Sequence, residues 1–498
     1  MIYSENVPIT SKTSLTLKIS DFSKGVNTRQ DENVLPLNYA INSYNFSFTS
    51  GALKNGLGLK ELSVPTDNST TKSFNLPTGV NKLLNIWHFR RYNKTLGKFE
   101  PYLVSYADNG YFYYGMLDDL DSHLYQLSNF TFNSKPVGVN YRIEDLDCLI
   151  FCSPNSNDDF AVWDGVNYPV LYANAPEITS AVLYAGRLFV TTGGDKSQLW
   201  FSDDLDPRNW TVNQFAGGYI ELTDERGCLN KVIETNNYLY IIRDFGITRV
   251  SAWGEQTDFI VRNLYLSTGK IYSNSAVLCG DDIIMLCRDG LYLFDGTDTT
   301  KICSGLDKYF TDVDNENAIG VFIDGKYYLA CKLNFDDDKI VGCESGANIN
   351  NALIEYDIDT REINILRGVD IGVMTSFQTQ KFSKLVIALN SGNTTKLMEL
   401  TRDGQVFGTS TKKVWTSPFS DLGYPAKQKI LKKFYINTQS ALKLEIKTEK
   451  MTYTFNLKGD VAPICVPLNI KCKKFSFNLE TDSSDCAISD AELQLYLA

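Results

Sequence analysis

The sequence predicts an all-β protein made of many short strands. Aromatic residues are abundant, with 28 Tyr and 28 Phe among 498 residues. Together with frequent Thr, Val and Ile they favour strands over helices. Short apolar runs also recur along the chain, and each ends at a turn that contains Gly, Asn or Asp. The chain is longer than one compact core usually holds, so more than one domain is expected.

A recurring unit occupies residues 75–405. In each copy a short apolar strand leads to a polar turn and then to a second, aromatic-rich strand. The clearest copies are AVLYAGRLFVTTGGDKSQLWFS (181–202), VIETNNYLYIIRDFGITRVSA (232–252) and AVLCGDDIIMLCRDGLYLFDG (276–296). Their irregular period of roughly 35 to 50 residues falls in the range of propeller blades. We therefore expect a β-propeller of about six or seven irregular blades, with two consecutive β-sandwiches as the alternative.

The two ends of the chain depart from this repeat. Residues 411–498 give longer strands in which apolar and polar residues alternate, which predicts a C-terminal β-sandwich. Residues 1–62 predict an extended N-terminal arm for docking, with one short helix near PLNYAINSYNF that begins at Pro36. This arm has too little apolar periodicity to form a core of its own, so we expect it to pack on the propeller or sandwich and to contribute to contacts between subunits. Removing residues 1–60 is expected to leave a folded propeller.

Composition excludes several classes of protein. The chain has 48 basic and 59 acidic residues and a net charge of −11, which argues against a general binder of nucleic acid or anionic membranes. No apolar run approaches the ~18 residues of a membrane helix, and the first residues lack the pattern of a secretory signal. The eleven Cys form no C-x-x-C pair. We interpret them as reduced core residues of a protein that folds in a cytosol.

Residues suited to catalysis or cofactor binding are scarce. A catalytic triad would have to use His88 or His123, of which the first lies in a strand-like run and the second in a polar segment. No phosphate-binding loop or dinucleotide fingerprint occurs. Zinc would need clustered Cys, which are absent. The sequence therefore predicts no enzyme, no metal and no cofactor.

The stretch LWFSDDLDPRNWT (199–211) is the strongest metal-site candidate. Its Asp203, Asp204 and Asp206 resemble a calcium loop, but an EF-hand requires Gly at position six and Glu at position twelve. Arg208 and Asn213 occupy those positions. The stretch DVDNENAIGVFI (312–323) fails the same test. An Asp-Pro pair followed by Arg and Asn instead predicts a turn, with Trp200 and Trp210 on the flanking strands.

Three stretches resemble tail nozzle and tail hub propeller proteins of short-tailed phages, of the tail tubular and packaged-DNA stabilisation type. The first (19–62) follows their pattern F-x-G-G-(L/V/I)-N-T, with Lys24 in place of the first Gly and no Arg before the last Gly. It matches at Phe22, Gly25, Asn27, Thr28, Leu35-Pro36, Asn45, Gly51, Leu53 and Gly58. The others are LWFSDDLDPRNW (199–210) and WTSPFSDLGYPAKQK (415–429), which in those proteins lie in the propeller and at the start of a C-terminal sandwich.

The resemblance implies a virion structural protein that folds in the host cytoplasm and acts in the phage tail. It would form a ring, with six copies as the best guess, that extends or closes the DNA channel. Portal-adaptor proteins and tail fibres or spikes would be its partners, and genomic DNA would pass without sequence-specific binding. The residues expected to dock and assemble are Phe22, Gly25, Asn27, Leu35, Pro36, Tyr39, Tyr44 and Phe46. The alternative is a propeller that binds or cleaves glycans on a host surface.

Overall fold

The computed structural model describes residues 13–65, 71–73, 76–116, 123–214, 216–267, 269–337, 340–344, 349–379 and 382–498. Their regular structure is strand except for three short 3-10 helices, η1 (Thr49–Gly51), η2 (Gln256–Asp258) and η3 (Ser304–Phe310), so the all-β prediction is confirmed. No helix among these residues is long and apolar enough to cross a membrane. Residues 1–12 of the predicted N-terminal arm lie outside the described part of the chain.

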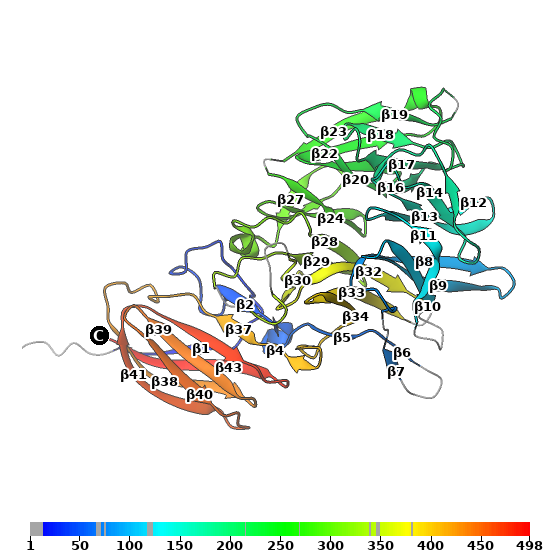
Figure 1. The fold of residues 1–498 in the computed structure, drawn as a ribbon. Coiled ribbons are helices and arrows are strands. Elements are labelled where there is room, and N and C mark those ends of the chain that lie inside the picture. Colours follow the sequence, from blue (N-terminus) through cyan, green and yellow to red (C-terminus); the bar gives the residue numbers. More distant parts are fainter. Residues whose placement is uncertain are drawn as a thin grey trace, which may run out of the picture.

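Six four-stranded antiparallel sheets follow one another along the chain (Figure 1). The first sheet contains β8 (Leu83–Asn93), β9 (Lys98–Ala107), β10 (Tyr111–Met116) and β11 (Tyr125–Thr131). The second contains β12 (Val137–Ile143), β13 (Leu146–Cys152), β14 (Phe160–Trp163) and β15 (Val170–Tyr172). The third contains β16 (Ile178–Tyr184), β17 (Arg187–Thr192), β18 (Gln198–Phe201) and β19 (Gly218–Glu221). The fourth sheet contains β20 (Leu229–Thr235), β21 (Tyr238–Arg243), β22 (Gly246–Ser251) and β23 (Ile260–Leu266). The fifth contains β24 (Ile271–Cys279), β25 (Asp282–Cys287), β26 (Gly290–Phe294) and β27 (Thr299–Ile302). The sixth contains β28 (Ile319–Ile323), β29 (Lys326–Cys331), β30 (Ala352–Asp357) and β31 (Ile363–Arg367).

A seventh sheet closes the ring with a strand taken from the N-terminal segment. It contains β32 (Ile371–Gln378), β33 (Ser383–Ser391) and β34 (Thr394–Thr401), and its fourth strand is β5 (Gly58–Glu61), which pairs antiparallel with β34. The first strands of successive sheets contact one another around the ring, and β32 returns to contact β8. At this seam His88 lies against Phe377, with 4.4 Å between their ring centroids. The arrangement is that of a β-propeller, and we call each sheet a blade.

Short strands extend the seventh blade. They are β35 (Gln405–Val406), which pairs parallel with β5, and β36 (Thr409–Ser410). A separate hairpin, β6 (Ser63–Pro65) and β7 (Thr71–Ser73), follows β5. Backbone hydrogen bonds from Leu62 to Leu397 and from Thr395 to Asn81 hold the segment that crosses the seam.

Two further sheets pack face to face beside the propeller and share one apolar core (Figure 1). One contains β3 (Phe46–Ser47), β4 (Leu53–Asn55), β43 (Ala487–Leu497), β38 (Lys429–Thr438) and β41 (Ile464–Cys472), with β1 (Thr13–Ile19) also paired to β43. The other contains β2 (Asn42–Tyr44), β37 (Lys413–Thr416), β42 (Phe475–Thr481), β39 (Leu442–Thr448) and β40 (Thr452–Leu457). The N-terminal segment thus supplies four strands to this sandwich.

Two expectations for the N-terminal segment are wrong. No helix forms near Pro36, because the chain there makes separate turns in which Val34 N donates to Asp31 O and Tyr39 N donates to Pro36 O. Residues 1–60 are also not dispensable for the propeller, because they contain most of β5. Their removal would leave the edge of β34 and the apolar faces of the seventh blade uncovered.

Leu59 tests this closure. Its side chain is buried in the core of the seventh blade, so Leu59→Ala should lower the free energy of unfolding in urea by about 2–5 kcal/mol. The neighbouring side chain of Lys60 is 57% exposed and pairs with Glu399 at 2.8 Å, so Lys60→Ala should cost less than about 1 kcal/mol. Equal, small losses for the two variants would show that β5 does not hold the ring closed.

Candidate functional site

The predicted docking residues lie at the junction between the sandwich and the propeller. Phe22, Leu35, Tyr44 and Phe46 are buried within the chain itself. Gly25, Asn27 and Tyr39 are half-buried, and Pro36 is exposed. These residues therefore dock the N-terminal segment on its own sandwich and propeller, while a contribution to contacts between subunits stays a prediction.

The first and third of the stretches that resemble phage proteins meet in one joint. Phe22 packs edge-on against Trp415, with 5.1 Å between ring centroids, and both side chains are buried. Ile41 N donates a hydrogen bond to Thr416 O at 2.9 Å, and the Glu32 carboxylate accepts one from Phe419 N at 2.9 Å. Stretches at opposite ends of the sequence thus form a single packed unit.

The segment around Asn27 fastens this joint to η3 of the propeller. Thr28 donates to Gly305 O through both its N–H and its hydroxyl at 2.8 Å, and Lys308 N donates to the Thr28 hydroxyl at 3.1 Å. A Cβ at position 305 would lie 2.1 Å from Val26 O, so only glycine permits this approach. Gly25 adopts a φ of 65° and accepts a hydrogen bond from Ala40 N.

Asn45, which matched the pattern of the first stretch but was not among the predicted docking residues, is central to the junction. It is fully buried and has a φ of 63°, a left-handed conformation that Asn tolerates. Its Nδ2 donates to Lys412 O at 2.7 Å and to Arg367 O at 3.3 Å, and its Oδ1 accepts from Arg367 N at 2.7 Å. One side chain therefore ties β31 of the propeller to the strand that enters the sandwich.

Arg367 places a buried charge at the same point. Its guanidinium pairs with Asp337 at 2.7 Å and Glu344 at 3.0 Å and lies over the rings of Tyr44 and Phe335. Burial raises the pKa of Tyr44 to about 12, so its phenol stays neutral beside these groups. A buried charge is tolerated only when it is paired in this way. No local pattern in the sequence indicates this cluster, because its members come from four separate segments.

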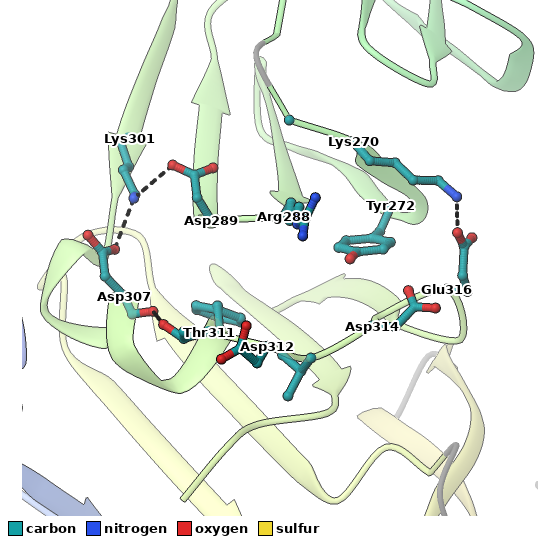
Figure 2. Close-up of a pocket in the computed structure, with 13 residues that line it drawn as sticks. Lys270, Tyr272, Arg288, Asp289, Lys301, Asp307, Thr311, Asp312, Asp314 and Glu316 are labelled. Atoms are coloured by element: carbon teal, nitrogen blue, oxygen red, sulfur yellow. Dashed lines mark hydrogen bonds and ion pairs between the residues drawn. The ribbon is translucent and has the colours of Figure 1, made fainter. Parts of the chain in front are cut away.

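A pocket of about 940 Å³ lies beside η3, whose Asp307 and Phe310 are among its lining residues (Figure 2). Lys301 bridges Asp289 at 3.0 Å and Asp307 at 3.1 Å, and Lys270 pairs with Glu316. Its other charged side chains are Arg288, Asp312 and Asp314. Acidic residues of the stretch rejected above as a calcium loop thus line the pocket. No group of three potential metal ligands occurs among the described residues.

A smaller cavity of about 410 Å³ lies among the innermost strands β20, β24, β28 and β32. Lys231 is its single charged lining residue, and its ammonium donates to Ala276 O at 2.7 Å. Burial lowers the pKa of this lysine to about 8. The cavity walls are otherwise apolar side chains, Gly320 and two hydroxyl residues, so they offer no acid–base pair for catalysis.

The stretch at 203–209 is a turn, as predicted. Asp206 Oδ1 accepts hydrogen bonds from Arg208 N at 3.0 Å and from the Arg208 guanidinium at 2.7 Å. Burial opposes ionisation, but these bonds lower the pKa of Asp206 overall. Asp203 Oδ2 accepts from Asn209 Nδ2 at 2.8 Å. Trp200 lies on β18, whereas Trp210 follows the turn outside any strand, which corrects that part of the prediction.

The histidines and cysteines show no activated nucleophile. His123 is exposed, and His88 lies in β8, in line with the polar segment and the strand-like run that surround them in the sequence. Burial, with a smaller effect of Arg90, lowers the pKa of His88 to about 4, and its Nε2 has no hydrogen-bond partner among the described residues. All eleven cysteines are free thiols, and burial raises the pKa of most of them, for example that of Cys148 to about 12.

Comparisons with known proteins concern the fold alone. No protein-family model and no curated protein matches the chain. Solved structures that resemble it are β-propeller proteins. PorZ, a surface component of the type-IX secretion system of Porphyromonas gingivalis, shares 12% identity over 78% of this chain and 46% of PorZ, with a TM-score of 0.38. The chain therefore spans less than half the length of PorZ.

Two further structures have similar scores. BBS1N, solved in complex with ARL6DN, shares 8% identity over 65% of this chain and 93% of that one, with a TM-score of 0.41. KlHsv2 with a replaced loop shares 9% identity over 58% of this chain and 97% of that one, with a TM-score of 0.32. Likenesses at this level carry no functional argument.

Substitution of Asn45 should separate its hydrogen bonds from its backbone conformation. Asn45→Gly keeps a residue suited to the positive φ but removes the three hydrogen bonds to the main chain of Arg367 and Lys412, so unfolding in urea should become easier by about 2–4 kcal/mol. Asn45→Ala should lose roughly 1 kcal/mol more from the left-handed conformation. Stabilities within error of the unaltered protein would contradict the assigned role.

His88 should make the stability depend on pH. Its pKa falls from 6.5 to about 4 on folding, so between these values the unfolded chain binds more protons than the folded one. The stability contributed by the neutral ring is complete above pH 6.5 and is lost as the pH falls toward 4. His88→Leu should flatten that part of the profile measured by thermal unfolding. A profile parallel to that of the unaltered protein would refute this.

Proposed function

We propose that the chain is a virion structural protein, a nozzle or hub subunit that forms a ring in the tail of a short-tailed phage. The observation that carries the proposal is the joint between Phe22 and Trp415. It is built from two of the three stretches that resemble such proteins, and it lies in the core of the sandwich. These residues act through packing and not through chemistry, as expected for an architectural component.

The mechanism of such a protein is mechanical. A ring of subunits sets the bore of the DNA channel, and each subunit must hold its two bodies at a fixed angle under load. The hydrogen bonds of Asn45 to Arg367 of β31 and to Lys412 at the entry to the sandwich would supply that rigidity. A net charge of −11 suits passage of DNA, because a channel that bound phosphate tightly would slow it. Portal-adaptor proteins and tail fibres would contact the outer surfaces of the ring.

Glycan recognition is the second candidate function. Tyr168 is 76% exposed and Trp253 is 55% exposed, and exposed aromatic rings on a propeller can stack on sugars. Trp253 is held in place by a hydrogen bond from its Nε1 to Asn237 O at 3.3 Å. In this alternative the protein would bind, or bind and cleave, carbohydrate on a host surface.

Electron microscopy and light scattering of the purified protein test the two proposals. A nozzle subunit should form closed rings, with six copies as the expected number, and should not retard duplex DNA in a gel at physiological salt. A glycan-binding protein should instead retain host polysaccharide on an affinity column, and a Tyr168→Ala/Trp253→Ala variant should lose that retention. Monomers at every concentration together with such retention would replace the first proposal with the second.

A further inference from the structure

The smaller cavity of the propeller combines apolar walls with a single charge. Its volume of about 410 Å³ falls in the range of roughly 300–1,000 Å³ that is usual for pockets that bind small molecules. The innermost strands of four consecutive blades, β20, β24, β28 and β32, form its walls. Pockets for small molecules are mostly apolar and carry a few placed polar groups, which is the composition found here.

The walls are predominantly apolar. The larger apolar side chains that line the cavity are Ile233, Val277, Leu278, Val321, Phe322 and Met374. Position 320 has to be glycine, because a Cβ there would collide with Ser275 O. Strands β24 and β28 therefore approach each other closely and hold this wall in place. The side chains of Val277 and Phe322 remain partly exposed, so a ligand in the cavity can reach them.

Lys231 places a cation against these walls without a counter-ion. Its side chain is half-buried and lines the cavity. Among the described residues its ammonium makes one hydrogen bond, to Ala276 O at 2.7 Å, and no ion pair. Burial alone lowers the pKa of this lysine, and no neighbouring carboxylate opposes that effect. An ammonium has three donors, so two N–H groups are available to a ligand.

The hydrogen bond between blades does not by itself require a lysine. Lys231 follows a shift in the strand register of β20, and Asn85 and Ser180 follow the corresponding shifts in β8 and β16. Asn85 Nδ2 donates to Pro136 O at 2.9 Å, and Ser180 Oγ accepts from Val232 N at 3.2 Å. Each of these neutral side chains ties its blade to the next one. The positive charge of Lys231 is therefore additional to that structural role.

A carboxylate is the anion that fits this cation. A charge held among apolar walls is costly unless an opposite charge pairs with it. Carboxylate oxygens accept strong, charge-assisted hydrogen bonds from an ammonium. A phosphate monoester carries about two negative charges at neutral pH, which one lysine in an apolar site does not balance. The walls in turn favour a hydrocarbon tail on the same molecule.

We infer that the cavity binds a small carboxylic acid with an apolar tail, whose carboxylate accepts hydrogen bonds from Lys231. The tail would lie against the apolar walls supplied by β24, β28 and β32. The inference concerns binding, and it assigns no chemical step to any residue. It does not rest on the proposed ring function.

A series of straight-chain acids tests the match to the cavity. Titration calorimetry of the purified protein with butanoate, hexanoate and octanoate should show one saturable site. The affinity should rise about fourfold for each added methylene until the walls are covered. Octan-1-ol and octylammonium have the same chain but no carboxylate, so they should bind at least about tenfold more weakly than octanoate.

Substitution of Lys231 tests the role of the cation. Lys231→Met keeps an unbranched side chain that suits an apolar wall, and it should lower the affinity for octanoate by about tenfold or more. The affinity for octan-1-ol should not fall, because the alcohol does not need the charge. The matched control Lys447→Met removes an exposed lysine of the sandwich and should change neither affinity.

A second variant tests the walls. Val277→Phe fills part of the cavity and leaves the cation in place, so it should weaken octanoate and octan-1-ol alike. Circular dichroism would establish that all three variants are folded.

Several results would overturn the inference. Equal affinities of the unaltered protein for octanoate and octan-1-ol would show that the cation does not select the acid. An unchanged octanoate affinity in Lys231→Met would place the acid elsewhere, and an equal loss of both ligands in that variant would make Lys231 purely structural. If the unaltered protein bound no octanoate, the site would be wrong, while ring formation would still test the proposed function separately.

Discussion

A four-stranded sheet with two apolar faces is stable only when both faces are covered, and this requirement governs the propeller. Each blade buries its faces against the blades on either side, as shown by the apolar cluster that joins Ile233 and Ile242 of the fourth blade to Met285 of the fifth. The row of blades has no free end only because β5 completes the last one and β32 meets β8. Closure of the ring is therefore a condition for the stability of every blade.

The junction with the sandwich follows from the same segment. Hydrogen bonds fix the chain on both sides of β5. Asn45, before it, is bonded to β31, and Leu62, directly after it, is bonded to β34. The sandwich, which contains β1 to β4, is thereby anchored to the closing blade at short range. The buried Arg367 with its two carboxylates lies at this anchor and disfavours any rearrangement that would separate the pairs.

The sequence was sufficient to predict the strand content and the repeated unit, because alternating apolar residues and Asp-Gly turns are local signals. The turn at Asp206-Pro207 was predictable for the same reason. The strand that closes the seventh blade was not, because nothing in residues 58–61 indicates a partner at 398–401. Local reasoning also failed at Pro36, where a residue suited to a helix start lies in a series of turns. Asn45 matched the pattern of the first stretch, but its hydrogen bonds could not be predicted, because its partners Arg367 and Lys412 are brought to it only by the fold.

The pairing of early strands with late ones has a consequence for synthesis in the cell. Strand β5 leaves the ribosome before any blade exists, but its partner β34 ends at Thr401. Strand β1 can pair only later in synthesis, because its partner residues extend to Leu497. Long-range pairing of this kind is slow and exposes unpaired strands to other nascent chains. Neither body can be completed on a shortened product, so an interrupted translation yields a chain in which both the propeller and the sandwich lack strands.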